Sequence, residues 1–306
     1  MVFQSVIGFA QLALQSSVGL GKLGEPLMNS NVPGIAKIDW QGLKFIRPYG
    51  TFPHTNVLAG SIVFALFACM YLYQKSLKSI LICTLFFGSA LILTFSRSAW
   101  LGFLIALIFS LVFTRVRHKL VVFASLVFVF CGILFTQFQG PLVQRILGND
   151  GQSSLERELY MNISKEMILQ HPLGVGLGNF TLMMQDFTQQ KLAPWVIQPV
   201  HNVYMLAMNE LGVQGLVLFL LMAGNFVFIV IHERKDHQLE SSGALSKKGL
   251  NFSITSLKIA LLFTFLVIGL FDHYFFTLEQ GQFLFIFLMA FLCYTEKKDA
   301  LPRMKS

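Results

Sequence analysis

The sequence predicts an all-α, polytopic transmembrane helix bundle, and two observations lead to this prediction. The chain of 306 residues is 55% hydrophobic and only 12% charged, with a mean hydropathy of +0.65, whereas soluble domains have about 25% charged residues. Apolar runs also recur that approach the length needed to cross ~30 Å of hydrocarbon, and they predict about seven or eight spans. We therefore expect one integral membrane domain over residues 1–306.

The distribution of basic residues predicts the orientation of these spans. The formal net charge is +8, and many Lys and Arg residues fall in segments 75–78, 115–119, 232–248 and 297–305. The positive-inside rule places such segments in the cytoplasm. We expect 232–256 to form a cytoplasmic loop, and 21–56, 96–100, 136–200 and 272–280 to face outward. Because orientation accounts for the charge, no nucleic-acid partner is expected.

The expected spans follow in chain order. Residues 1–20 are weakly apolar and form a spanning or an interfacial helix; they lack the basic start of a cleavable signal peptide. A polar loop over about 21–56 follows. Further spans are expected at 57–73, 80–95, 101–113, 120–135, 203–231, 257–275 and 283–294. Only a very tight turn, within SRSAWLG (96–102), joins the second and third of these.

The segment 136–200 is predicted to be one large outer loop that contains short helices. Ser153 and Glu156 have the spacing of a capping box, and a helical pattern continues to about Gln170. HPLGVGLGNF (171–180) then ends this helix with Pro172 and alternating glycines. This segment is either a structural turn or a set of backbone N–H groups that bind an anion.

Four candidate functional residues fall on the predicted outer side: Arg47, Arg97, Arg157 and His201. Arginine binds phosphates through two parallel hydrogen bonds, so converging outward arginines would suit a lipid-linked phosphate or diphosphate. Arg97 interrupts an apolar stretch, which indicates either such a role or an interfacial side chain that reaches the headgroups.

His201 is either a helix cap or a general base, since the ordinary histidine pKa lies near neutrality. Glu210 could orient it only if the chain bends, and Asp272 with His273 forms another outward polar pair. No HExxH, DxD or Cys/His cluster predicts a metal site. The four cysteines, Cys69, Cys83, Cys131 and Cys293, lie in apolar runs without CxxC spacing. We expect no disulfide, metal or other cofactor.

Four motifs in order resemble those of one family: RPYGTFPHTN (47–56), TFSRSAWLG (94–102), the outer helix around Arg157 with HPLGVGLGNF, and HNVYMLAMNELGVQG (201–215). Over residues 20–290 the chain resembles the O-antigen ligase and polymerase superfamily of bacterial envelope glycosyltransferases. Members of this family carry several further spans before the segment that begins here near Gly21. We therefore expect a short member of the family, an N-terminal truncation or a mispredicted start.

The resemblance implies a metal-independent, inverting enzyme in the bacterial cytoplasmic membrane, with its active site facing the periplasm or exterior. The donor would be a glycan on undecaprenyl diphosphate. The acceptor would be lipid A-core, a growing polysaccharide or a protein, with membrane lipids around the enzyme. Carried over by motif, Arg47, Arg97 and Arg157 bind the diphosphate and His201 is the base. Asn202, Tyr204 and Glu210 support it.

Several alternatives stay open at this stage. Ligase, repeat-unit polymerase and protein O-oligosaccharyltransferase share these motifs, and ligase is the first choice. A lipid-linked glycan transporter or flippase would also need outward cations, but it should show polar groups at mid-membrane. A non-catalytic remnant is a third reading. The four candidate residues argue against it.

Overall fold

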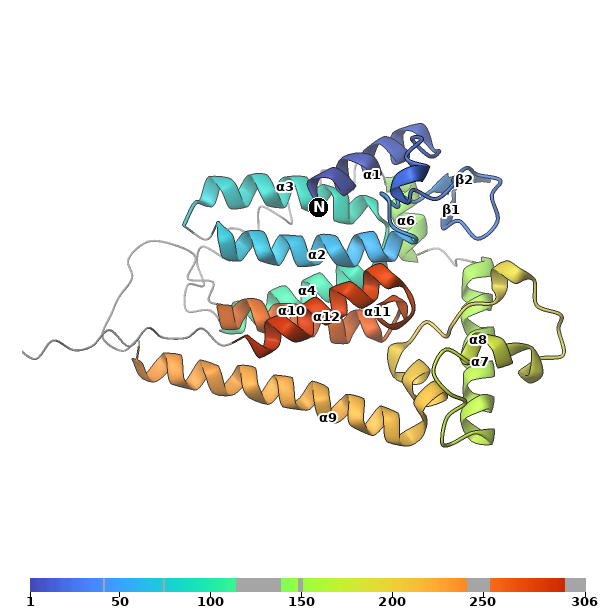
Figure 1. The fold of residues 1–306 in the computed structure, drawn as a ribbon. Helices are drawn as coiled ribbons and strands as arrows, with labels where there is room; N and C mark the ends of the chain where they lie inside the picture. The colour runs from blue at the N-terminus through green and yellow to red at the C-terminus, as the bar shows by residue number, and fades with distance from the viewer. Residues whose placement is uncertain (41, 74, 114–138, 148–150, 241–253, 295–306) are drawn as a thin grey trace, which may run out of the picture.

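The computed structural model describes residues 1–306 except 41, 74, 114–138, 148–150, 241–253 and 295–306, and the described chain is mostly helical (Figure 1). The longer helices are α1 (Val2–Leu14), α2 (Thr55–Leu72), α3 (Leu77–Leu93), α4 (Arg97–Phe113), α6 (Gln139–Leu147), α7 (Gly151–Gln170), α9 (Val203–Glu240), α10 (Ile254–Gly269) and α12 (Glu279–Cys293). The short ones are η1 (Gly21–Leu23), α8 (Phe180–Met183), η2 (Met184–Phe187), η3 (Pro194–Val196) and α11 (Tyr274–Thr277).

Two helices are apolar and long enough to cross a membrane: α2, with 18 residues, and the part of α9 from Val203 to Ile229, with 27. Five shorter apolar helices accompany them, namely α1, α3, α4 as far as Ser110, α10 and α12. These helices suit a helical membrane protein, while the count of seven or eight spans stays a prediction. The predicted span 120–135 and most of the predicted cytoplasmic loop 232–256 lie outside the described residues.

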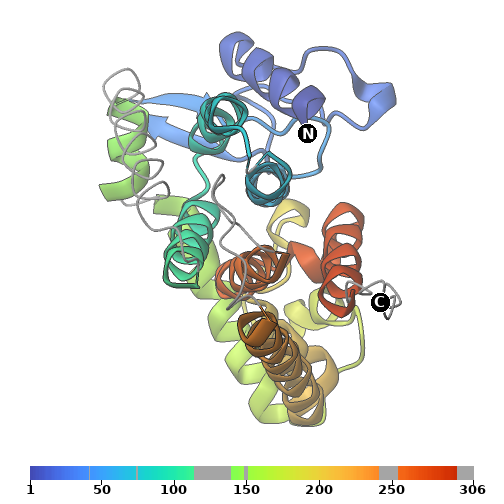
Figure 2. The ribbon, with the colours of Figure 1, turned by 90° about the vertical axis from the view of Figure 1, so that its left-hand side faces the viewer.

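The apolar helices lie side by side, and α10 is central to their packing. It packs against α4, α2, α9 and α12. Gly102 on α4 permits a close approach, because a Cβ there would lie 3.1 Å from the Ile268 side chain on α10. Figure 2, which looks along the helices, shows α4 and α12 on opposite sides of the α2–α10 pair.

A tight turn is present between the apolar segments α3 and α4 as predicted, but it lies at residues 94–96, and most of SRSAWLG (96–102) belongs to the start of the following helix. Helix α3 ends at Leu93 and α4 begins at Arg97. Phe95 has φ 53°, a left-handed conformation that is rare for an aromatic residue. The Trp100 indole N–H donates to the Leu91 carbonyl oxygen at 3.0 Å and so closes the turn. As a result the basic side chain of Arg97 is placed at the end of the bundle.

The expectation of a purely helical fold with a polar loop at 21–56 was wrong in one respect. Strands β1 (Lys37–Trp40) and β2 (Leu43–Ile46) form an antiparallel hairpin in which Lys37 faces Ile46. Ile38 and Ile46 are both buried, and they lie on opposite faces of the hairpin because Ile38 pairs with Phe45 and Ile46 pairs with Lys37. Gly42 takes φ 79° in the turn. Strand β1 packs against α6, so the hairpin is stabilised by a segment about a hundred residues later.

The helices expected in the segment 136–200 are present as α6, α7 and α8. Helix α7 begins at Gly151, so Ser153 lies in its first turn and does not precede it, and the helix ends at Gln170 as predicted. These helices and the β-hairpin gather at one end of the bundle, on the right in Figure 1. The side of a membrane that this end faces remains a prediction from the charge pattern.

The glycine-rich segment 171–178 packs on a break in α9. At Gly212 the backbone takes φ 73° and ψ −174°. The N–H groups of Val175 and Gly176 donate to the carbonyl oxygens of Asn209 (2.8 Å) and Glu210 (2.9 Å). The Val213 N–H donates in turn to the Pro172 carbonyl oxygen at 3.0 Å. The segment therefore satisfies backbone groups that the break in the helix exposes, which supports its interpretation as a structural turn.

Candidate active site

Arg47 lies just before α2 and reaches into the protein. Its side chain is only 4% exposed. The guanidinium donates through Nε to the Thr94 carbonyl oxygen and through one Nη to Asn56 Oδ1, each at 2.8 Å. Arg47 therefore ties the start of α2 to the α3–α4 turn and fixes the amide of Asn56.

Asp272, in the turn between α10 and α11, is the carboxylate at the centre of this region. It is 3% exposed. Its Oδ2 accepts a short hydrogen bond from the Asn56 side-chain amide, and its Oδ1 accepts from the His273 backbone N–H at 3.0 Å. The chain Arg47–Asn56–Asp272 thus joins segments that are more than 200 residues apart in sequence.

His201 lies immediately before α9, against α7 and the α10–α11 turn. Its ring stacks on that of Tyr160, with centroids 5.6 Å apart and planes 5° apart. It meets the His273 ring edge-on at 4.9 Å. Its Nδ1 is buried and has no hydrogen-bond partner among the described residues. The ring is therefore held by aromatic contacts on two sides.

Two residues of the same motif hold His201 beside Asp272. Asn202 caps α9, because its Oδ1 accepts from the Met205 N–H at 2.9 Å, and its amide donates to the Leu270 carbonyl oxygen at 3.1 Å. The Tyr204 hydroxyl donates to the Leu266 carbonyl oxygen at 2.8 Å. Both contacts fasten the start of α9 to the end of α10, next to the turn that carries Asp272.

Glu210 serves a different neighbour. Its carboxylate accepts from the Phe180 N–H at 3.5 Å, and its backbone carbonyl accepts from Gly176. None of the hydrogen bonds described for it goes to His201. Glu210 therefore holds the 171–178 segment against α9 through these two contacts.

Three arginines meet at a cavity of about 300 Å³. The cavity is lined by Asn56, Ser96, Arg97, Ser98, Leu101, Arg145, Arg157 and Phe271. Arg145, on α6, is 6% exposed and donates through Nε to the Phe95 carbonyl oxygen at 3.0 Å. Arg97 donates to the Arg145 carbonyl oxygen at 3.3 Å. The structure therefore brings Arg97 and Arg157 together, while Arg47 lies behind Asn56 and is not in the lining.

The site keeps its histidines neutral and its aspartate charged. Burial lowers the pKa of His201 to about 3, helped by His273, Arg157 and His54, although Asp272 opposes the shift. Burial likewise lowers the pKa of His54 to about 4 and depresses that of His273. Burial raises the pKa of Asp272, but its interactions with the three histidines and with Arg157 outweigh this, and the net pKa lies below the ordinary value.

Sequence reasoning missed Arg145 and gave no definite role to Asp272, His273 or His54. Arg145 lies in an unremarkable amphipathic stretch, and only the packing of α6 brings it to the cavity. A signal for Asp272 was available, because DHY at 272–274 interrupts an apolar run. Buried ionisable groups in such runs tend to mark function or pairing.

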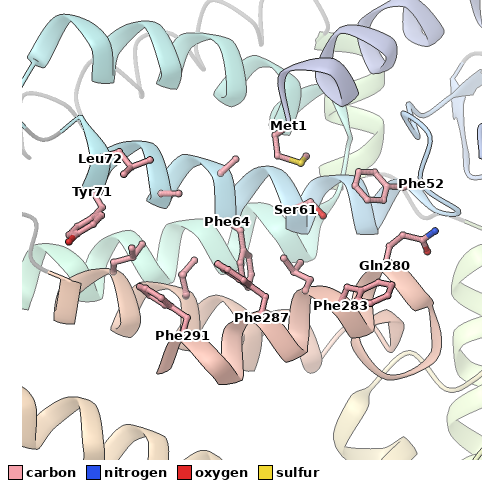
Figure 3. A pocket seen from close by; sticks show the side chains of 15 residues that line it. Met1, Phe52, Ser61, Phe64, Tyr71, Leu72, Gln280, Phe283, Phe287 and Phe291 are labelled. Carbon is pink, nitrogen blue, oxygen red and sulfur yellow. The ribbon is translucent and has the colours of Figure 1, made fainter. Parts of the chain in front are cut away.

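An apolar groove of about 690 Å³ runs between α2 and α12, beside α10 (Figure 3). Phe52 and Gln280 lie at one end, while Tyr71, Leu72 and Phe291 lie at the other. Phe283 lies beside Gln280, and Phe64 and Phe287 line the middle. The lining residues on α2 run from Ser61 to Leu72, a stretch of helix about 18 Å long.

Within the described part of the chain, no group of three His, Cys, Asp or Glu side chains is placed to hold a metal ion. The charged groups around the cavity are the side chains of Arg97, Arg145 and Arg157. Guanidinium groups and hydroxyls at such a cavity are suited to phosphate oxygens.

The apolar helices carry at one end a cavity lined by three arginines, next to the buried Asp272 and the partly buried His201. Such a cavity is suited to an anionic group. Residues 80–220 match the family model described as O-antigen ligase. This match covers somewhat less than half of the chain, and it supports membership of the O-antigen ligase superfamily. A search of curated proteins gave no match. The matched segment includes Arg97, Arg145, Arg157 and His201, whereas Arg47 and Asp272 lie outside it.

Proposed function

We propose that this protein transfers an oligosaccharide or polysaccharide from undecaprenyl diphosphate to an acceptor hydroxyl, on the outer face of the bacterial cytoplasmic membrane. The observation that carries the proposal is the arginine-lined cavity beside the partly buried His201 and the buried Asp272. The match of residues 80–220 to the O-antigen ligase family model supports it. Ligation to lipid A-core is the form that we propose first. Growing polysaccharide and protein are the other acceptors that this chemistry would serve.

The arginines supply the charge that departure of a diphosphate requires. In the proposed step the acceptor oxygen attacks the anomeric carbon, the bond from that carbon to the diphosphate oxygen breaks, and the configuration inverts. Negative charge then grows on the leaving oxygen. Arg97, Arg145 and Arg157 provide fixed cations around the cavity, so the charge is stabilised by groups that are already oriented, with no metal ion.

His201 is proposed to take the proton of the acceptor hydroxyl. A neutral imidazole is required, and burial provides one. A pKa near 3 would make a weak base, but the cation of Arg157 contributes to that value. A bound diphosphate would offset this cation and raise the pKa of His201 toward the working range. Asp272 would then stabilise the imidazolium that forms.

The apolar groove between α2 and α12 is proposed to hold a hydrocarbon chain of a lipid substrate. The part of the groove along α2 is about 18 Å long, more than half of the ~30 Å thickness of the hydrocarbon layer, and most of the side chains that line it are apolar. Its outer end begins at Phe52, two residues before His54. A chain in the groove would therefore place its headgroup near the level of the site.

The test is transfer in vesicles that contain the purified protein, with an undecaprenyl-diphosphate-linked oligosaccharide, lipid A-core and a chelator. Wild type should transfer, and His201→Ala should lose transfer while it still inserts and binds donor. A matched control is His171→Ala, since His171 is in the outer segment but lies against Phe187. Equal transfer by wild type and His201→Ala would refute the assignment of the base. Loss of transfer with chelator would refute metal independence.

A further inference from the structure

Helix α7 carries two residues of the site one turn apart. Arg157 lines the cationic cavity, and Tyr160 stacks on His201. Residues three apart on an α-helix lie on the same face. The Tyr160 side chain is only 1% exposed and packs in a core cluster with Ile163, Met167 and other residues of the outer segment. It is therefore a fixed surface and not a mobile side chain.

The usual means of orienting a catalytic histidine does not operate here. A histidine ring is normally fixed by a hydrogen bond through the nitrogen that does not react. The Nδ1 of His201 is buried, and the described residues offer it no partner. The contacts that define its plane are the parallel Tyr160 ring and the perpendicular His273 ring.

We infer that Tyr160 is a positioning residue, whose ring fixes the plane of the His201 imidazole relative to the diphosphate cavity. The inference rests on the proposed function. Since α7 also carries Arg157, one rigid helix sets both the cation that faces the leaving group and the surface that orients the base. The distance between leaving group and base is thereby fixed by the geometry of a single helix turn.

The ring of Tyr160, and not its hydroxyl, is the part of the side chain that orients the His201 imidazole. The hydroxyl oxygen is buried and has no hydrogen-bond partner among the described residues. It therefore contributes no contact that would hold His201. An aromatic ring without the hydroxyl should orient the imidazole equally, whereas an aliphatic side chain of similar size should not, because parallel stacking needs a second flat ring.

The kinetic test compares Tyr160→Leu with Tyr160→Phe, and uses Met167→Ala as a control for lost packing in the same cluster. Tyr160→Leu should lower kcat by about ten- to a hundred-fold, the scale expected for a displaced catalytic group, with little change in the donor KM. Tyr160→Phe should restore most of this loss. Equal loss in Tyr160→Phe and Tyr160→Leu would overturn the inference, and so would an equal loss in Met167→Ala.

A second readout is independent of turnover. The rate at which diethyl pyrocarbonate modifies His201, followed by mass spectrometry against pH, reports the exposure and the pKa of the imidazole. Tyr160→Leu should admit water, speed modification and move the pKa midpoint upward toward 6.5, because burial is the largest cause of the depressed pKa. The groups that face His201 are His273, Asp272, Arg157, His54 and Tyr160, and only the last is changed.

The two readouts separate the two proposals. If the wild type transfers nothing, the proposed reaction is refuted. If, in the same series, His201 becomes exposed and its pKa rises only in Tyr160→Leu, the positioning role still stands. An unchanged modification profile in Tyr160→Leu would refute the positioning role, whatever the activity.

Discussion

Replacing Asp272 by Asn tests the arrangement of the site most directly. The substitution keeps the shape of the side chain and removes one buried negative charge. One carboxylate oxygen accepts from the Asn56 amide and the other from the His273 N–H. In Asn one of these acceptors becomes an NH₂ group, so one donor is left facing another donor.

The magnitude follows from the bond that is lost. A hydrogen bond to a charged group contributes about 1.5–3 kcal/mol. Expressed wholly in the transition state, this corresponds to a fall in rate of about 10- to 150-fold. The loss of the counter-charge to an imidazolium at His201 acts in the same direction, so we expect the upper part of this range.

The assay is glycan transfer in vesicles, measured across pH. Asp272 raises the pKa values of His201, His54 and His273. Without its charge these values fall further, and the acid limb of the activity profile should move to lower pH. Transfer near neutral pH should fall at the same time, because the histidines are already neutral there and only the lost stabilisation matters.

A matched control is Asp39→Asn, the same chemical change at an exposed position of β1. It should leave both rate and profile unchanged. Wild-type turnover by Asp272→Asn in a properly inserted protein would refute the reasoning. An acid limb that moves to higher pH would show that Asp272 does not face the base.

Three further predictions concern the cavity, the α9 break and the groove. Arg157→Lys keeps the charge but loses the planar pair of donors, so transfer should fall at least about tenfold and the donor KM should rise. The control Lys165→Ala, at an exposed position of the same helix, should change neither value. Equal kinetics in the two variants would count against Arg157 as a diphosphate ligand. Gly212→Ala should lower the thermal stability of the detergent-solubilised protein, because φ is 73° and a Cβ would lie 2.5 Å from the Leu173 carbonyl oxygen. In the control Gly224→Ala the new Cβ meets no neighbour within 4 Å. A Gly212→Ala protein that melts at the wild-type temperature would exclude the described break. Ala68→Phe should fill the groove and raise the KM for a long-chain lipid substrate but not for a short-chain analogue. The control is Ile82→Phe, at an exposed position of α3. No effect of Ala68→Phe on either substrate would remove the groove from the proposal.

The glycine-rich segment shows how far local patterns reach. The motifs HPLGVGLGNF and NELGVQG were both visible in the sequence, but their relation was not. Each alone is compatible with an anion-binding loop or a turn. The observed pairing between backbone groups of residues 172–176 and 209–213 decides for the turn, because N–H groups already used by carbonyl oxygens are not available to an anion.

The sequence by itself predicted the helical character, the order of the apolar helices, a tight turn between two of them and the family motifs. These depend on hydropathy and on residues close together in the chain. The β-hairpin was missed because α6, about a hundred residues later, packs against it. Only the tertiary structure brought Arg145 to the cavity and placed Arg47 behind Asn56. The position of Asp272 beside His201 likewise depends on contacts across as many as 216 residues of chain. Such pairings depend on how helices pack, and no local pattern encodes them.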